Sequence, residues 1–312
     1  MEYILTSIRL ISPLILLMVF GYFLNKINIL DDRSSTQISK LVLKVLLPIN
    51  IFINIYRSDF ITAFNSRLIV FILLCNFVGL FIMNIIAHKL TSDRRQLGVI
   101  IQDGIRGNYS ILGLPLAISV YGSEMAVYMS IVIAFLTPLY NIISIMLFEH
   151  YDNLKSSFAK QLFNVFKSPL TLGSVLGVVL NLCNVVIPSF LLETLNYISV
   201  SLTAISLLNL GSTFNFKLNK NVIKPLIVIL IFKMFLFPAI VIVSTSLMGF
   251  RNELLLSAAI VSAVPIAVSS YATAVCYNTD KDLANSAVVY SHVIGAISMP
   301  IMLSILMSLG LI

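Results

Sequence analysis

The sequence predicts an all-α polytopic membrane protein with ten transmembrane helices, arranged as two inverted halves of five. Hydrophobic residues make up 59% of the 312 residues and charged residues only 11%. Long apolar runs follow one another along the chain, and parts of its first half recur in the second. A water-soluble domain carries roughly 25% charged residues. At a mean hydropathy of +1.01, lipid must be the solvent for most of this chain.

Each apolar run is long enough to cross a bilayer as a helix. A hydrocarbon core of about 30 Å needs about 20 helical residues at about 1.5 Å per residue. The runs are continuously apolar and lack the alternation of a membrane β-strand. We therefore expect helical spans over residues 8–25, 37–56, 67–87, 97–121, 125–148, 167–187, 193–213, 224–248, 253–276 and 284–310.

Several other classes of protein do not fit. The net charge is +7, but no basic cluster is longer than Arg94-Arg95, so we expect no nucleic-acid partner. The first span lacks a basic leader and a small-residue cleavage site, so we expect no removable signal peptide. Cys75, Cys183 and Cys276 lie within or at the end of spans without metal-type spacing, and we expect free thiols. The sequence suggests no cofactor and no metal site.

The basic residues predict the orientation of the chain, because Lys and Arg accumulate in short cytoplasmic loops. The connections after the odd-numbered spans hold Lys26, Arg33, Lys40, Lys89, Arg94, Arg95, Lys155, Lys160, Lys167, Lys217, Lys220, Lys224 and Lys281. The opposite side holds Arg9, Arg57, Arg67 and Arg251. This bias predicts that both termini lie on the non-cytoplasmic side of the plasma (inner) membrane.

An internal repeat relates the two halves. SPLILLMVFGYFLN at 12–25 matches SPLTLGSVLGVVLN at 168–181, and LPLAISVYG at 114–122 matches VPIAVSSYA at 264–272. Chance between leucine-rich segments explains one such match more easily than several in the same order. We predict a five-helix repeat at 1–150, a cytoplasmic connecting loop at 151–166 and a second repeat at 167–312. Five is odd, so the second half is inverted, an arrangement typical of secondary transporters with a midplane substrate site.

Spans 4 and 9 are predicted to be broken helices. Span 4 contains Gly104, Gly107, Gly113 and Pro115, and span 9 carries Pro265 at the position matching Pro115. Glycine loosens a helix and proline removes a backbone donor. Paired interrupted segments mark the binding site of a transporter. The alternative is a pair of ordinary proline kinks in packed helices.

Such breaks suit an anion. A half-helix that begins near Pro115 or Pro265 would point free N–H groups and a positive dipole end at the break. Nearby polar side chains could add hydrogen bonds. Asn50, Asn54 and Asn209 either line the cavity or bond across helices. The candidate substrate-binding residues are Asn108, Tyr109, Gly113, Leu114, Pro115, Pro265, Ser269, Ser270, Asn50 and Arg106.

The charged residues inside spans have two readings. Asp103 and Arg106 are three apart and share a helix face. Arg106 either attracts the anion at the cytoplasmic entrance, or the pair only neutralises itself. Lys44 and Lys233 are expected to snorkel toward the membrane surface. For His292 we expect a packed, neutral side chain rather than a proton relay.

The broken segments carry a family resemblance. GNYSILGLPLAISVYG at 107–122, VPIAVSSYATAVCYN at 264–278 and, more weakly, LVLKVLLPINIF at 41–52 resemble the auxin efflux carrier family, with its plant PIN carriers and bacterial malate and malonate permeases. The resemblance covers nearly the whole chain. It implies that spans 4 and 9 cross as in NhaA-type and bile-acid-carrier-type folds, between a scaffold domain and a mobile transport domain.

The resemblance also concerns single residues. It implies that Asn108 contacts substrate and that Pro115 and Pro265 are the crossover prolines. The chain departs from the plant carriers at Ser270, where they have a second proline, and at Ser269, where they have an apolar residue. It also lacks their long central loop. The compact chain therefore resembles the bacterial members.

The sequence favours a secondary transporter of a small organic anion. An intramembrane enzyme is the first alternative, but the chain has no His-Glu-x-x-His and no Gly-x-Ser-x-Gly motif. A channel-like membrane protein is the second. No phosphate-binding loop for an ATP-driven pump is present. The expected partners are the anion and the lipid bilayer, while coupling to Na+ or H+ and a homodimer stay open.

Overall fold

The computed structural model is all-helical in the part of the chain that it describes, which comprises residues 2–57, 64–122, 124–151, 167, 169–214, 216, 218–274, 277 and 279–312. Within these residues the only strand-like pairing is one isolated antiparallel bridge between Gly107 and Ile266. The prediction of an all-α fold is therefore confirmed. Most of the predicted connecting loop at 151–166 lies outside the described residues, as do Lys155, Lys160, Lys217 and Cys276.

The helices follow the apolar runs of the sequence. The first half contains α1 (Glu2–Lys26), α2 (Asp32–Leu41), the π-helical turn η1 (Val42–Leu46), α3 (Leu47–Tyr56), α5 (Ser66–Leu90), α6 (Arg94–Asp103), the π-helical turn η2 (Tyr109–Gly113), α7 (Leu114–Tyr121) and α8 (Met125–Tyr151). The second half contains α10 (Pro169–Leu182), α11 (Ser189–Ser212), α12 (Lys220–Ile231), the π-helical turn η3 (Phe232–Leu236), α13 (Phe237–Leu247), α14 (Asn252–Ala263), α15 (Val268–Ala274) and α16 (Lys281–Ser308).

Six helical runs among the described residues are long and apolar enough to cross a membrane. They are Arg33–Tyr56, Ser66–Leu90, Met125–Tyr151, Ser189–Ser212, Lys220–Leu247 and Lys281–Ser308. Shorter apolar helices overlap the other four predicted ranges, at Ser12–Lys26, Tyr109–Tyr121, Thr171–Leu182 and Asn252–Ala263. Two of these short helices are parts of the predicted broken spans, which explains why they fall below the length of a full crossing.

Each of the three π-helical turns ends two residues before a proline. The turns η1, η2 and η3 precede Pro48, Pro115 and Pro238. Proline lacks an N–H and its ring clashes with the carbonyl of an α-helix one turn earlier. A wider turn relieves this clash, since the amide after it bonds five residues back, as Leu114 N–H does to Tyr109 O. These prolines therefore lie inside helical runs rather than ending them.

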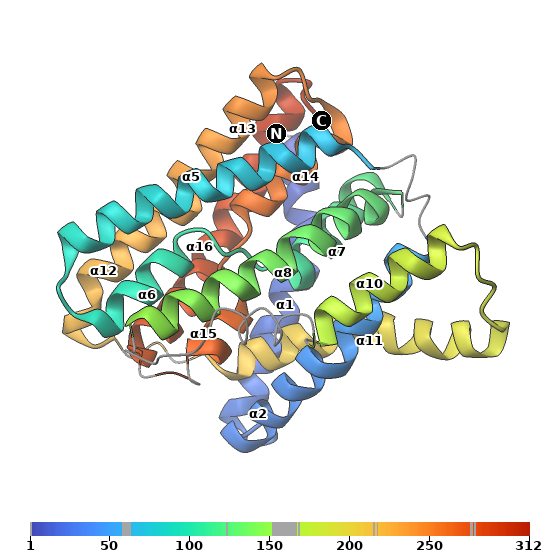
Figure 1. Cartoon of the computed structure of the whole chain (residues 1–312). Helices are drawn as coiled ribbons and strands as arrows, with labels where there is room; N and C mark the ends of the chain where they lie inside the picture. Colours follow the sequence, from blue (N-terminus) through green and yellow to red (C-terminus); the bar gives the residue numbers. More distant parts are fainter. Residues whose placement is uncertain are drawn as a thin grey trace.

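The helices pack in close pairs (Figure 1). Helix α1 packs against α11 and α16, and α3 packs against α10 and α11. Glycine permits the closest approaches: a Cβ at Gly21 would lie 1.9 Å from Leu208 O, and one at Gly211 would lie 1.8 Å from Met18 O. Small residues bring membrane helices together in this way. The glycines therefore fix the spacing of α1 and α11.

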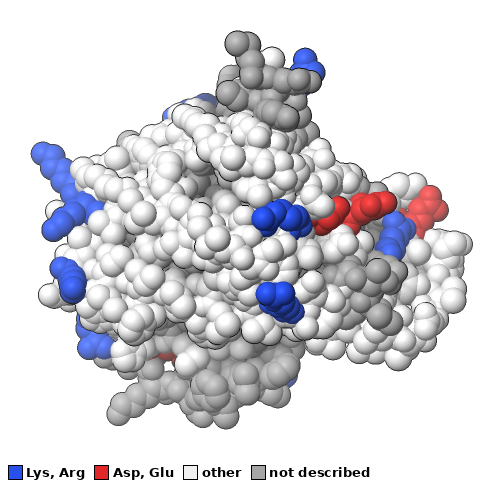
Figure 2. Space-filling model, turned by 90° about the horizontal axis from the view of Figure 1, so that it is seen from above, with Lys and Arg blue, Asp and Glu red and all other residues white. Residues whose placement is uncertain are grey.

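The surface fits a lipid environment. Many large apolar side chains are exposed, with Leu247 83% and Val186 87% accessible. Figure 2 shows one face of the molecule that is mostly uncharged, with scattered basic and acidic side chains. Soluble monomers rarely expose such extensive apolar surface. Of the cysteines, Cys75 is half-buried and Cys183 exposed, both as free thiols.

Candidate functional site: two interrupted helices in contact

Two helical runs are interrupted, and the interruptions touch. Helix α6 ends at Asp103 before the turn η2, and α14 ends at Ala263 before the short helix α15. Between them the chain pairs antiparallel: Asn108 N donates to Pro265 O at 2.7 Å, and Ala267 N donates to Arg106 O at 3.3 Å. Extended backbone is tolerated at membrane depth only where protein or a water-filled cavity satisfies its polar groups. Here each interruption supplies partners to the other.

The first interruption is not where the sequence predicted it. We expected a half-helix that begins near Pro115, but helical structure already resumes at Tyr109, and Pro115 lies inside the helical run after the turn η2. The prediction was wrong because the π-helical turn accommodates the proline without a break. The second interruption does contain Pro265, in the extended residues before α15. Two prolines that match in the repeat thus have different local structures.

Glycines let the two interruptions come into contact. A Cβ at Gly107 would lie 2.8 Å from Val264 Cγ2 and 3.0 Å from Val261 O, and one at Gly113 would lie 2.8 Å from Ile260 Cγ2. All three distances are shorter than ordinary packing allows. The glycines at these two predicted positions are therefore explained by close approach to α14 and the residue after it.

Arg106 connects the two interrupted runs. Its buried guanidinium donates through Nη1 to Ser144 Oγ at 2.6 Å and through Nη2 to Ser269 Oγ at 3.0 Å. Ser144 lies on α8 and Ser269 on α15, so one cation reaches side chains of two other helices. Of these two serines, the sequence analysis identified only Ser269. A single serine in a long apolar helix gives no signal of such a contact.

Asp103 does not pair with Arg106. The carboxylate is fully buried and its Oδ1 accepts hydrogen bonds from Ser270 Oγ and from Gln102 Nε2. Its Oδ2 has no hydrogen-bond partner among the described residues. Gln102 Nε2 also donates to Ser270 Oγ. No ion pair joins Asp103 to Arg106 among the described residues. Each side chain instead bonds to a different serine of α15, so both interpretations of the pair, entrance for the anion or mutual neutralisation, stay predictions.

Asn108 lies against His292 of α16. His292 Nδ1 donates to Val288 O at 2.7 Å, which leaves Nε2 to accept from Asn108 Nδ2 at 3.4 Å. Both side chains are buried. This arrangement agrees with the packed, neutral histidine that we predicted. Tyr109 is also buried, with its ring 5.8 Å from that of Tyr140 on α8.

Lys233 corrects a second expectation. We predicted that its side chain would snorkel, but it is 0% exposed and its Nζ donates to Ser262 O at 2.6 Å. It lies near the middle of the run Lys220–Leu247, and half a hydrocarbon core is about 15 Å, beyond the reach of a lysine side chain. Lys44, in another π-helical turn, η1, is exposed as expected.

Asn50 does not join this cluster. Its amide donates to Ser199 Oγ at 2.9 Å on α11, and Asn54 donates to Asn50 Oδ1 at 3.1 Å. Asn209 likewise donates to Ser39 Oγ at 2.8 Å. Asn50 and Asn209 thus bond across helices, which is one of the two arrangements expected, whereas Asn54 bonds within α3. Leu114 is buried beside Gly113, and Pro115 is half-buried.

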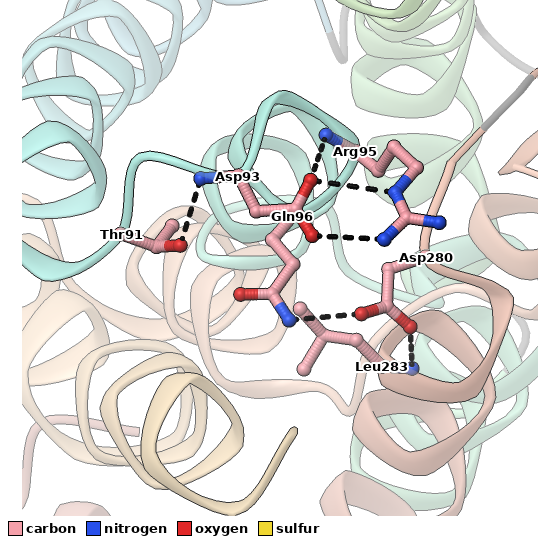
Figure 3. A network of polar contacts seen from close by, with 6 residues as sticks. All are labelled: Thr91, Asp93, Arg95, Gln96, Asp280 and Leu283. Atoms are coloured by element: carbon pink, nitrogen blue, oxygen red, sulfur yellow. Dashed lines mark hydrogen bonds and ion pairs between the residues drawn. The ribbon is translucent and has the colours of Figure 1, made fainter. Parts of the chain in front are cut away.

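A separate polar network ties the start of α6 to the start of α16 (Figure 3). Asp280 N donates to Arg95 O at 3.0 Å, and Gln96 Nε2 donates to Asp280 Oδ2 at 2.9 Å. The other carboxylate oxygen of Asp280, Oδ1, accepts from Leu283 N and so caps the start of α16. The hydrogen bond from Arg95 lowers the pKa of Asp93, so this small surface contribution to stability is complete at neutral pH and is lost as the pH falls below about 4.

One hollow of the described surface lies away from this cluster. It measures about 300 Å³ and is lined by Ser66, Arg67, Val70, Phe71, Leu74 and Met248. None of these residues belongs to the interruptions, whose side chains are nearly all buried. The chemistry of the buried cluster, rather than the size of a surface hollow, therefore identifies the candidate site.

Comparison with known proteins agrees with this picture. A family model described as a membrane transport protein matches residues 6–303. An uncharacterized transporter of Methanocaldococcus jannaschii is 25% identical over 88% of this chain and 90% of its own, and one of Methanothermobacter thermautotrophicus is 23% identical over 95% and 97%. The uncharacterized transporter YfdV of Escherichia coli is 24% identical over 64% and 66%. The chain belongs to the membrane transport protein family that includes the auxin efflux carriers.

Proposed function

We propose that this protein is a secondary transporter that moves a small organic anion, a carboxylate such as malate, malonate or an auxin-like acid, across the plasma (inner) membrane by alternating access. The substrate site lies where the two interrupted helices meet. Residues from both interruptions line it, with Asn108, Ser269 and Arg106 nearest the anion.

The observation that carries this proposal is the balance of buried charge. Arg106 and Lys233 are buried at the interruptions, and Asp103 is the one carboxylate buried there among the described residues. Charged side chains inside a membrane are costly and usually serve a pathway. An excess of basic groups over acidic groups in a low dielectric favours an anionic ligand. A cation carrier would need the opposite balance.

The packing of the helices supports two inverted repeats of five with crossed spans 4 and 9. Gly21 and Gly177 occupy the same place in the repeated segments 12–25 and 168–181. A Cβ at Gly21 would strike Leu208 O of α11, and one at Gly177 would lie 3.0 Å from Phe52 O of α3. Repeat-related glycines thus make related contacts. Ten spans leave both termini on one side, outside the cell by the basic bias.

A transport assay with purified protein in proteoliposomes tests the function. We expect saturable uptake of one class among a panel of labelled carboxylates, and exchange when the vesicles are preloaded with the same unlabelled acid. A neutral amide analogue should compete at least tenfold more weakly, because a charge-assisted hydrogen bond contributes about 1.5–3 kcal/mol. Equal competition by acid and amide contradicts the anion site, non-saturable flux indicates a channel, and product formation indicates an enzyme.

A further inference from the structure

A fully buried lysine lies where the two interruptions meet. Lys233 belongs to the π-helical turn η3, and its Nζ donates to Ser262 O, one residue before the end of α14. A Cβ at Gly107 would be 3.1 Å from the same Nζ. The ring of Phe237 lies 5.7 Å from Nζ. The amino group is therefore enclosed between the end of one interrupted helix and the extended peptide of the other.

The groups that contact the Lys233 amino group carry partial rather than formal negative charge. Among the described residues no Asp or Glu carboxylate lies within ion-pair distance of Lys233. The last carbonyls of a helix have no intrahelical partner, and they bear the negative end of the helix dipole. In secondary transporters such half-helix C-terminal ends coordinate the coupling cation. The amino group of Lys233 makes the same kind of contact from within the chain.

We infer that Lys233 is a built-in cation at the end of α14, and that transport therefore requires no bound monovalent metal cation. This inference rests on the proposed transport function and adds that transport is not coupled to a bound metal cation. Lys233 is a positioning residue: it holds the carbonyl end of α14 against Gly107 and so keeps the two interruptions together. A coupling cation would have to displace the amino group of Lys233 from the carbonyl end of α14. Because that amino group is covalently attached to the chain, its local concentration there is far higher than that of a dissolved cation.

The chain supplies a matched control. Lys44 also lies in a π-helical turn two or more residues before a proline, but its side chain is exposed. Substitution of Lys44 thus removes the same charge from the same local structure without emptying a buried site. The variants are Lys233→Met, which keeps length without charge, Lys233→Ala, which leaves space for a small cation, and Lys44→Ala.

The first experiment measures uptake into proteoliposomes of the carboxylate found in the panel, with Na+, K+ or choline as the only monovalent cation. We expect the wild-type rates to agree within about twofold. In choline, we expect uptake by Lys233→Ala to be at least tenfold slower than uptake by wild type. Na+ or methylammonium should raise the uptake rate of Lys233→Ala at least threefold, whereas the rate of Lys44→Ala should stay near that of wild type. Wild-type uptake that depends on Na+ overturns the inference, as does wild-type uptake by Lys233→Met.

The second experiment does not need transport. Thermal unfolding of the purified full chain, without substrate, is followed in choline, Na+ and methylammonium. We expect the small cations to raise the Tm of Lys233→Ala by about 3 °C or more, and to leave wild type and Lys44→Ala unchanged. A folded Lys233→Ala that no small cation stabilises refutes the built-in cation. Stabilisation of wild type by Na+ over choline also refutes it, even if Lys233→Ala does not fold.

The two experiments separate the two claims. If the wild type transports no carboxylate, the proposed function fails while the unfolding measurement still decides on Lys233. If transport is confirmed but depends on Na+, the built-in cation fails and the anion carrier stands.

Discussion

Neighbouring side chains at the interruptions have different roles because they face different partners. Ser269 is half-buried and accepts from Arg106, whereas Ser270 is fully buried and donates to Asp103. The Ser269 hydroxyl is bonded to Arg106, the cation that a substrate anion would approach. The Ser270 hydroxyl supports a buried carboxylate, which is expensive to leave unpaired. We therefore propose that Ser269 contacts the substrate and that Ser270 has a structural role.

The separation of Arg106 from Asp103 predicts the behaviour of a double variant. Arg106→Gln should raise the KM for the anion at least tenfold, because it removes a charge-assisted contact while Gln still reaches a serine. Asp103→Asn together with Arg106→Gln should be no better, because the two residues bond to different serines. Uptake kinetics in proteoliposomes check this. Full recovery by the double variant would show that Arg106 only neutralises Asp103.

The assignment of Ser270 predicts a loss of stability. Ser270→Ala should lower the free energy of unfolding by about 1–3 kcal/mol, because it removes a donor from a fully buried carboxylate. Ser119→Ala is the matched control, since Ser119 Oγ donates to Leu116 O within its own helix and has no other side-chain hydrogen bond in the described part of the chain. Denaturation in detergent compares the two variants. An equal effect at both positions would contradict the structural role of Ser270.

At the scale of elements, three prolines do not break the helical runs in which they lie, and glycines mark close approaches between backbones. Pro48, Pro115 and Pro238 follow π-helical turns within continuous helical runs, so they do not mark breaks. Glycines instead mark places where one backbone approaches another, as at Gly107 between the interruptions. The interruption in the first half is thus set by contact with the second half, and the proline eight residues later only adjusts the turn.

The contact between α1 and α11 predicts a steric effect. Gly211→Ala should destabilise the protein by about 1–3 kcal/mol or more, because the added Cβ would overlap the backbone of Met18 and force the helices apart. Val19→Ala on the exposed face of α1 serves as the control. Thermal unfolding of both variants is the measurement. Unchanged stability in Gly211→Ala would show that the two helices are not held at this distance.

For the whole molecule, the distribution of charge relates the fold to the membrane. Figure 2 shows a face that is mostly uncharged, and many large apolar side chains are exposed. Most described basic residues lie at or near helix ends. The buried charges gather at one place, where residues more than 150 positions apart meet. A membrane protein concentrates its costly polar groups where they serve function. The two halves of the chain therefore both contribute to one buried charged cluster.

Topology is the matching prediction for the whole molecule. Single cysteines at Lys89, after the third predicted span, and at Val186, at the end of the sixth and beyond the last residue of α10, should label differently once the native cysteines are replaced. Both positions are exposed. An impermeant thiol reagent added to intact cells should label position 186 and not position 89. The reverse pattern would show that the basic-residue bias gives the wrong orientation.

The sequence by itself determined the class of fold and the residues of interest. Continuous apolar runs require helices in lipid, because no other open structure satisfies the backbone there. Helix occupies most of each predicted range within the described residues, and the exceptions include the two interruptions. The glycines and polar residues of GNYSILG and VPIAVSS indicated that both runs are interrupted, because such residues are unfavourable in a lipid-facing helix unless another segment satisfies them. The exact place of the first interruption was predicted wrongly, near Pro115.

Only the tertiary structure decided which partners these residues have. Hydropathy describes a residue and its neighbours in sequence, so it could not separate Lys233, buried against Ser262, from the exposed Lys44. Nor could it reveal that Arg106 bonds to Ser144 of a distant helix. The cost of burying a charge depends on the groups that surround it, and folding alone brings those groups together from separate parts of the chain.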